Sequence, residues 1–466
     1  MPPFPSLLLL HAPPLIFGFS LLTALSKEKL PPIFMCLALS YGLGTGLISL
    51  WMFVLGICHI PFHWTAINVP LYLFSILLYS FSLVRIKMNK HPGISFSKNP
   101  GRLAGASIVF AAFIVISSIG VFWAAFNIPI LEWDAFSTHA FNAKVFFYEK
   151  TFAYLNSQPH ANYPLHIPLM QAWLSTAFGS WNDQVIKTLF PFYFLSLLII
   201  QYHFLIRHTT QPWSLLGLVL TISSPFLIYH ATIGYRDFTL LFFNISAILL
   251  LLLWQEEKSG IYLISSSLFS GLSSFTKLEG GGYLLIHIIL LTAILSRSQA
   301  PLREKSKSFL RFCIPAVGIF LLFHIYKYFS SGVSAALPPQ AQESLDIYSL
   351  RIDLSGKLLA RFGIVVNRFL YNLFLTNNWN IIWLMLLFSL LKIKKKACSF
   401  EVKLLFLALL LFFSIYLAGY VLTQHYYWVA ETETVLSRSL LHFFPLAPIL
   451  VILINFPGDE TPRRPH

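Results

Sequence analysis

Charged side chains are scarce in this sequence: they make up 11% of its 466 residues, whereas hydrophobic residues make up 56%. A soluble domain carries about 25% charged residues, so this composition excludes an ordinary soluble protein. Apolar runs of about twenty residues recur along the chain, and each can cross a hydrocarbon core of about 30 Å. Because a backbone in lipid must satisfy its hydrogen bonds internally, the sequence predicts an all-α, polytopic helical membrane protein.

Cysteine and internal repetition are also lacking. The chain has only four cysteines, Cys36, Cys58, Cys313 and Cys398, and no pair of them has metal-ligand spacing. We therefore expect neither a disulfide framework nor a zinc site. No internal repeat is visible, so the inverted-repeat architecture of many transporters finds no support at the level of the sequence.

The apolar runs predict about thirteen transmembrane helices. They lie roughly at 5–25, 33–57, 68–84, 105–127, 185–206, 213–231, 238–254, 261–275, 282–296, 311–329, 378–391, 403–422 and 440–456. With these spans, the basic stretches "RIKMNK", "REKSKSFLR" and "KIKKK" fall on one side, which carries the whole net charge of +14. The positive-inside rule makes that side cytoplasmic. The charge thus indicates topology, and a nucleic-acid partner is not expected.

Four segments are predicted from this span pattern. They are three extra N-terminal spans with a basic linker (1–104), a seven-span module (105–329) with a long outer loop (128–184), an outer loop with three C-terminal spans (330–456), and a polar tail (457–466). Within the outer loop, "DAFSTHAFNAKVFFYEK" and "YPLHIPLMQAWLSTAFG" each suit a short helix. We expect both helices to lie at the outer membrane interface.

Acidic residues stand at the outer ends of three predicted spans. Asp134 follows the fourth span, Asp237 lies in "GYRDF", and Glu279 lies in "TKLEGGG", accompanied by Arg236 and Lys277. Charges at span ends commonly anchor helices among lipid headgroups. Three acids on one face beside the same loop are less easily explained in that way, and they suggest a site.

Such a group could transfer a sugar from a polyprenyl-phosphate carrier to an acceptor hydroxyl. The hydroxyl needs a general base, and a carboxylate such as Asp134 can take its proton. The leaving lipid phosphate needs cationic or hydrogen-bonding partners, for which Lys277, Arg438 and His442 are candidates.

The motifs that carry this hypothesis are "EWDAFSTHAFNAKVFFYEK", "HANYPLHIPLMQAWLSTAFG", "GYRDF", "SSFTKLEGGG" and "LSRSLLHFFP". In their order they resemble the bacterial GT-C superfamily of integral-membrane glycosyltransferases, near the protein O-mannosyltransferases and the aminoarabinose transferase of lipid A. The resemblance covers 105–329 and implies a seven-span core with two juxtamembrane helices in the first outer loop. Asn162 departs from the acid that relatives often carry before Tyr-Pro, and the three N-terminal spans lie outside the common module.

The resemblance implies that Asp134 is the catalytic base of an inverting transfer. It also implies that Asp237 contacts a sugar or a divalent metal ion, that the segment with Lys277 and Glu279 lies by the active site, and that the Arg438 segment, with His442, binds the donor phosphate. Three residues of the outer loop are further candidates for substrate contact: His139, Lys144 and Tyr163. Lys144 equally suits a headgroup anchor.

The implied partners are a polyprenyl-phosphate sugar donor, a glycan, lipid or protein acceptor, and membrane lipids. The implied location is the bacterial inner membrane, with the active site facing the periplasm or outside. The main alternative is a flippase or transporter for a lipid-linked or polar solute, which would need ionisable residues deep within spans. A non-catalytic scaffold would leave the outer acids unexplained. The sugar, the acceptor, and any metal requirement stay open.

Overall fold

The structure is a computed structural model of the whole chain. It describes residues 8–26, 30–89, 105–152, 155, 162–331, 358–393, 399–423, 425–431 and 433–457. Most of the predicted basic linker, most of the outer loop 330–377 and the polar tail lie outside these residues. Two compact units contain the chain: 1–97, 121–197 and 230–349 form the first, and 98–120, 198–229 and 350–466 form the second. The predicted domain boundaries stay predictions.

The described residues are helical throughout, apart from short connections, and eight helical segments are long and apolar enough to cross a membrane. These are α3 (Ile33–Ile57), α4 (Trp64–Asn89), α5 (Gly105–Asn127), α8 with α9 (Asp183–Lys187 and Leu189–Leu205), α12 (Arg236–Glu257), α14 (Glu279–Arg297), α15 (Leu302–Ser331) and α19 (Phe400–Leu422). A ninth is possible if α21 (Glu433–Leu441) and α22 (Leu446–Asn455), which meet at a bend of 48°, form one broken span. The chain is therefore an all-α integral membrane protein.

Thirteen spans are not shown. A helix lies at each predicted range, but several of these helices are shorter than the roughly 20 residues that cross a bilayer. They are α2 (Ala12–Leu25), α10 (Gln211–Ile222), α13 (Gly260–Thr276) and α18 (Ile382–Leu391). The predicted span 213–231 is divided at Ser224 between α10 and α11 (Pro225–His230), because proline at the first position of α11 cannot continue the preceding helix.

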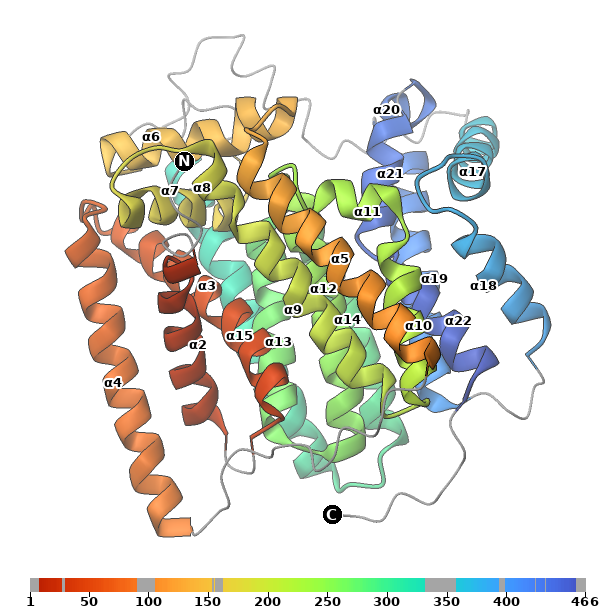
Figure 1. Cartoon of the computed structure of the whole chain (residues 1–466), viewed down its shortest axis with the longest axis horizontal. Helices are drawn as coiled ribbons and strands as arrows, with labels where there is room; N and C mark the ends of the chain where they lie inside the picture. Colours follow the sequence, from red (N-terminus) through yellow and green to blue (C-terminus); the bar gives the residue numbers. More distant parts are fainter. Residues whose placement is uncertain are drawn as a thin grey trace. The chain divides into compact units, whose positions relative to one another are not determined.

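The first unit packs the N-terminal helices directly against the helices that carry the predicted site. In Figure 1, α2, α3 and α4 lie together, and α6 (Phe141–Glu149), α7 (His166–Phe178) and α8 lie at one end of this unit. Helices α2 and α3 approach each other closely at two glycines. A Cβ on Gly18 of α2 would overlap the carbonyl oxygen of Ser40, and a Cβ on Gly44 of α3 would overlap that of Pro14. Such glycine contacts are typical of helices that associate within membranes.

The first predicted loop helix forms with a different phase. A π-helix, η1 (Ala135–Ala140), precedes α6, and its wider turns shift the register of the side chains. As a result Ala143 and Phe146 are buried, whereas Phe136 and Phe141 are exposed. The sequence predicted one short helix over this segment and did not predict the π-helical turn.

The second predicted loop helix is a core element. Helix α7 buries every side chain from His166 to Ser175, and its predicted position at the outer membrane interface stays a prediction. The helix ends at Gly179, whose left-handed backbone conformation, with φ 88°, is typical of a residue that terminates a helix. The next helix, α8, is capped by Asn182, whose Oδ1 accepts from the amides of Gln184 and Val185.

In the second unit, an amphipathic helix α17 (Leu358–Phe374) lies within the predicted outer loop 330–377. It packs against α19, α20 (Tyr426–Glu431) and α21. The amide of Asn372 donates to Ser437, and the indole of Trp379 donates to Asn372. This helix was not predicted, because it has one apolar and one polar face and so produces no continuous apolar run in the sequence.

Candidate functional site

Lys277 joins two carboxylates in the first unit. Its Nζ donates to Asp237 Oδ1 at 2.9 Å and lies 2.8 Å from Glu279 Oε1. The Lys277 side chain is 9% exposed, that of Asp237 is fully buried, and that of Glu279 is 34% exposed. Two of the predicted acids therefore meet at one lysine. Low exposure makes this ion pair stronger than a surface pair, and it also raises the cost of losing either partner.

Local sequence explains why these residues meet. Helix α13 ends at Thr276 and α14 begins at Glu279, so Lys277 lies in a two-residue break with extended backbone. Gly280 permits this sharp return, because a Cβ there would overlap the backbone of Ser273. Asp237 and Glu279 each lie in the first turn of a helix, where the helix dipole favours a negative charge.

Arg236 is the most unusual residue of the cluster. Its side chain is fully buried at the first position of α12. One guanidinium nitrogen, Nη1, donates to Pro164 O at 3.0 Å, and Cζ lies 5.1 Å from the centre of the Tyr163 ring. Within the described structure, Nε and Nη2 have no hydrogen-bond partner. A buried guanidinium with unused donors is energetically costly, so it is suited to an additional anionic or polar group.

Asp134 belongs to the same electrostatic environment. The negative carboxylates of Asp237, Glu279 and Asp134 each interact electrostatically with the positive guanidinium of Arg236. Asp134 is half-buried and directly precedes η1, but it does not cap that helix. The turn before α12 passes close by, since a Cβ on Gly234 would lie 3.6 Å from Ala135 Cβ. This turn needs glycine because its φ is 89°.

His139 adjoins the cluster, whereas Lys144 lies on the surface. The ring of His139 is 5% exposed and meets the ring of Tyr235, the residue before Arg236, edge-on at 6.3 Å. Lys144 is exposed, and its Nζ lies 5.8 Å from the centre of the Trp181 ring. That position fits the headgroup-anchor interpretation of Lys144 better than direct substrate contact.

The remaining predicted residues, Arg438 and His442, belong to the second unit. Arg438 is half-buried on α21. His442 is fully buried, and its Nδ1 lies 2.8 Å from Tyr416 Oη. Their part in donor binding stays a prediction.

A buried histidine, His166 of α7, supports the same end of the unit. His166 Nδ1 lies 2.7 Å from Ser49 Oγ, and its Nε2 lies 2.8 Å from Tyr193 Oη, which donates to Thr45. Burial lowers the pKa of His166 from 6.5 to about 3, so its ring is neutral at physiological pH. This network fixes α7 to α3 and α9, and α7 follows directly the segment that places Pro164 against Arg236.

Comparisons with protein-family models, curated proteins and solved structures find no match to this chain. The site therefore has to be interpreted from its own chemistry. It offers a half-buried carboxylate, a buried guanidinium with two unused donors, and two carboxylates bridged by a single ammonium. The ammonium of Lys277 supplies one positive charge between the carboxylates of Asp237 and Glu279.

Proposed function

We propose that this protein transfers a sugar from a polyprenyl-phosphate-linked donor to an acceptor hydroxyl at the periplasmic or outer face of a bacterial inner membrane. Asp134 takes the proton of the acceptor as its oxygen attacks the anomeric carbon. The bond from that carbon to the phosphate oxygen breaks, and polyprenyl phosphate leaves with the electron pair. One displacement of this kind inverts the anomeric configuration.

The observation that carries the proposal is the position of Arg236. A fully buried guanidinium, with Nε and Nη2 unused, lies within electrostatic reach of Asp134. In the proposed reaction those two donors bind the phosphate, whose negative charge grows as the sugar departs, and Asp134 serves the opposite partner of the same displacement. The seven-span GT-C arrangement and the roles of Arg438 and His442 belong to this proposal as well.

The placement of the charges favours a transferase over a flippase or transporter. Arg236 and Glu279 are the first residues of their helices, and Asp134 follows the end of α5 after a short connection. The cluster thus lies at helix ends, near the level of lipid headgroups, whereas a transport path needs ionisable groups along the middle of spans.

The test is sugar transfer by the purified protein in detergent, where transport has no meaning. The Asp134→Asn variant should lose at least about 100-fold in rate, the usual contribution of a general base, while its melting temperature stays unchanged. Glu149→Gln is the matched control, because Glu149 is an exposed carboxylate at the end of α6. Normal transfer by the Asp134→Asn variant would remove Asp134 from the role of base.

A further inference from the structure

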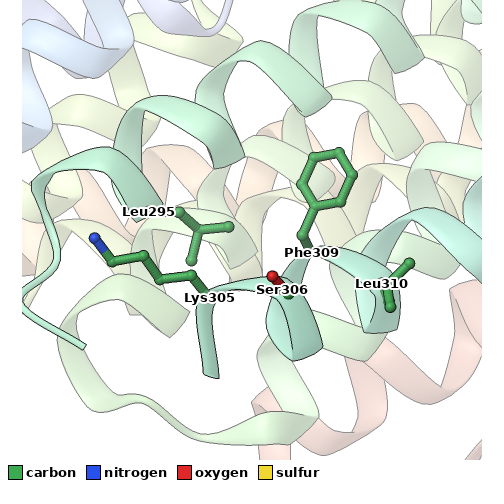
Figure 2. Close-up of a pocket in the computed structure, with 5 residues that line it drawn as sticks. All are labelled: Leu295, Lys305, Ser306, Phe309 and Leu310. Atoms are coloured by element: carbon green, nitrogen blue, oxygen red, sulfur yellow. The ribbon is translucent and has the colours of Figure 1, made fainter. Parts of the chain in front are cut away.

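A pocket lies at the other end of α14 from Glu279. Its lining comes from the last turns of α14 and the first turns of α15: Leu295, Lys305, Ser306, Phe309 and Leu310. Figure 2 shows the stem of Lys305 beside Leu295, with Ser306 and Phe309 following along α15. On α14 the pocket is lined by Leu295, which lies 16 residues after Glu279, so at 1.5 Å per residue the two are about 24 Å apart. The pocket is therefore distinct from the candidate site.

The charges around the pocket are mostly positive. Lys305 is half-buried, its backbone amide donates to Pro301 O at 3.1 Å, and its ammonium makes no hydrogen bond or ion pair among the described residues. Arg303, Lys307 and Arg311 on the same helix are exposed. The carboxylate of the neighbouring Glu304 pairs with Lys307, with 3.8 Å between Oε1 and Nζ. Among the described residues no carboxylate forms an ion pair with the ammonium of Lys305. A cation held partly out of water without a counter-charge favours an anionic ligand.

An apolar surface continues from the pocket along α15. Leu310 is 53% exposed, Ile314 67% and Leu321 43%. Their spacing of four and seven residues places them on one face of the helix, because side chains at such intervals are neighbours on the helix surface. A ligand with an anionic head at Lys305 would thus have an apolar path for a chain that runs toward the middle of the membrane.

We propose that this pocket binds the headgroup of an anionic phospholipid. The phosphate accepts from Lys305 and from the hydroxyl of Ser306, and one acyl chain lies along Leu310 and Ile314. A free phosphate would use only the charged part of this surface, whereas a lipid uses both parts. Basic pockets between membrane helices on the cytoplasmic side are suited to such headgroups, and this hairpin contains one of the basic stretches predicted to be cytoplasmic.

Lipid binding to the purified full-length protein can be measured by native mass spectrometry, with phosphatidylglycerol and phosphatidylcholine of identical acyl chains. Phosphatidylglycerol should bind several-fold more tightly to the wild type. Lys305→Gln should weaken its binding about fivefold, the contribution of one lysine near an anionic headgroup, and leave phosphatidylcholine unaffected. Lys307→Gln is the matched control, because Lys307 is half exposed and lies outside the pocket.

Three results would overturn the proposal. Equal binding of the two lipids would exclude headgroup selection. Equal losses in the Lys305→Gln and Lys307→Gln variants would indicate diffuse surface charge instead of a pocket. Displacement of phosphatidylglycerol by an equal concentration of glycerol phosphate would identify a soluble-anion site. Unchanged elution and melting of both variants would exclude misfolding as the cause of a loss.

Discussion

One residue, Lys277, fixes the electrostatic balance of the candidate site. Its ammonium satisfies the buried carboxylate of Asp237 and the partly exposed carboxylate of Glu279 at once. An ammonium is a compact charge with three donors, so it can serve two oxygens on different helices. Asp237, by contrast, has no access to water that could replace this partner, because its side chain is fully buried.

Replacing Lys277 with methionine should therefore destabilise the protein strongly. The variant keeps the apolar stem but removes the ammonium that contacts the buried carboxylate of Asp237, which typically costs about 3–5 kcal/mol. The expected result is a large fall in the melting temperature of the detergent-solubilised protein. Lys307→Met is the control: its ion pair with Glu304 is about half exposed and should contribute less than about 1 kcal/mol. Similar melting of the two variants would contradict the importance of the buried pair.

At the scale of elements, contact between α2 and α3 depends on two glycines that face each other's backbones. Gly18 lies against the carbonyl of Ser40, and Gly44 lies against that of Pro14. Without side chains at these positions the helices approach closely, and dispersion contacts replace the hydrophobic effect that is missing within lipid. This contact attaches the first helix of the chain to the core of the first unit.

Gly18→Ala should separate these two helices and destabilise the protein. The new Cβ meets backbone atoms, which cannot rotate away, so a cost of roughly 1–3 kcal/mol or more is expected from overpacking. Gly318→Ala provides the comparison, because nothing lies within 4 Å of a Cβ at that position of α15. There the substitution should be neutral or stabilise the helix by up to about 1 kcal/mol. Equal melting temperatures for the two variants would show that α2 and α3 are not in close contact.

At the scale of the whole molecule, the fold places the loop after Cys58 beside the end of α6. The amide of Phe62 donates to the carbonyl of Lys150, the residue after α6, at 2.9 Å. The connection between α14 and α15, which includes Gln299, lies at the opposite ends of those helices from Glu279. The predicted topology thus assigns Cys58 and Gln299 to opposite faces of the membrane.

Labelling with a membrane-impermeant maleimide tests this topology. In a variant whose other cysteines are serine, exposed Cys58 should react from the outside of intact cells. A cysteine-free variant carrying Gln299→Cys should react only after permeabilisation, because the basic hairpin is cytoplasmic under the positive-inside rule. Reaction of both cysteines from one side would refute the topology.

Much of the helical framework could be predicted from the sequence. Long apolar runs predict helices because lipid leaves the backbone no other partner, and α3 and α5 have the predicted bounds. The span number could not be obtained in this way, since a run such as α10 followed by α11 appears continuous until a proline divides it. Helix α17 and the π-helix were missed because neither produces a long apolar run or a regular period.

The candidate site was only partly predictable. The acids at span ends identified Asp134, Asp237 and Glu279 as a group, and the structure brings them within range of one arginine. That Arg236 is buried with unused donors depends on the tertiary position of Pro164 and Tyr163, which no local pattern encodes. The burial of His166 likewise follows from the packing of α7 and not from its sequence.

The ion pairs of Lys277 with Asp237 and Glu279 restrict how two helices can move. Because one ammonium bridges the start of α12 and the start of α14, tilting either helix away from the other would break a buried ion pair. The starts of α12 and α14 and the break after α13 are therefore expected to move together as one unit. The segments beside Arg236 that lie outside this bridge are η1 and the stretch with Tyr163 and Pro164, so an opening that admits a bulky ligand there is expected to involve one of them.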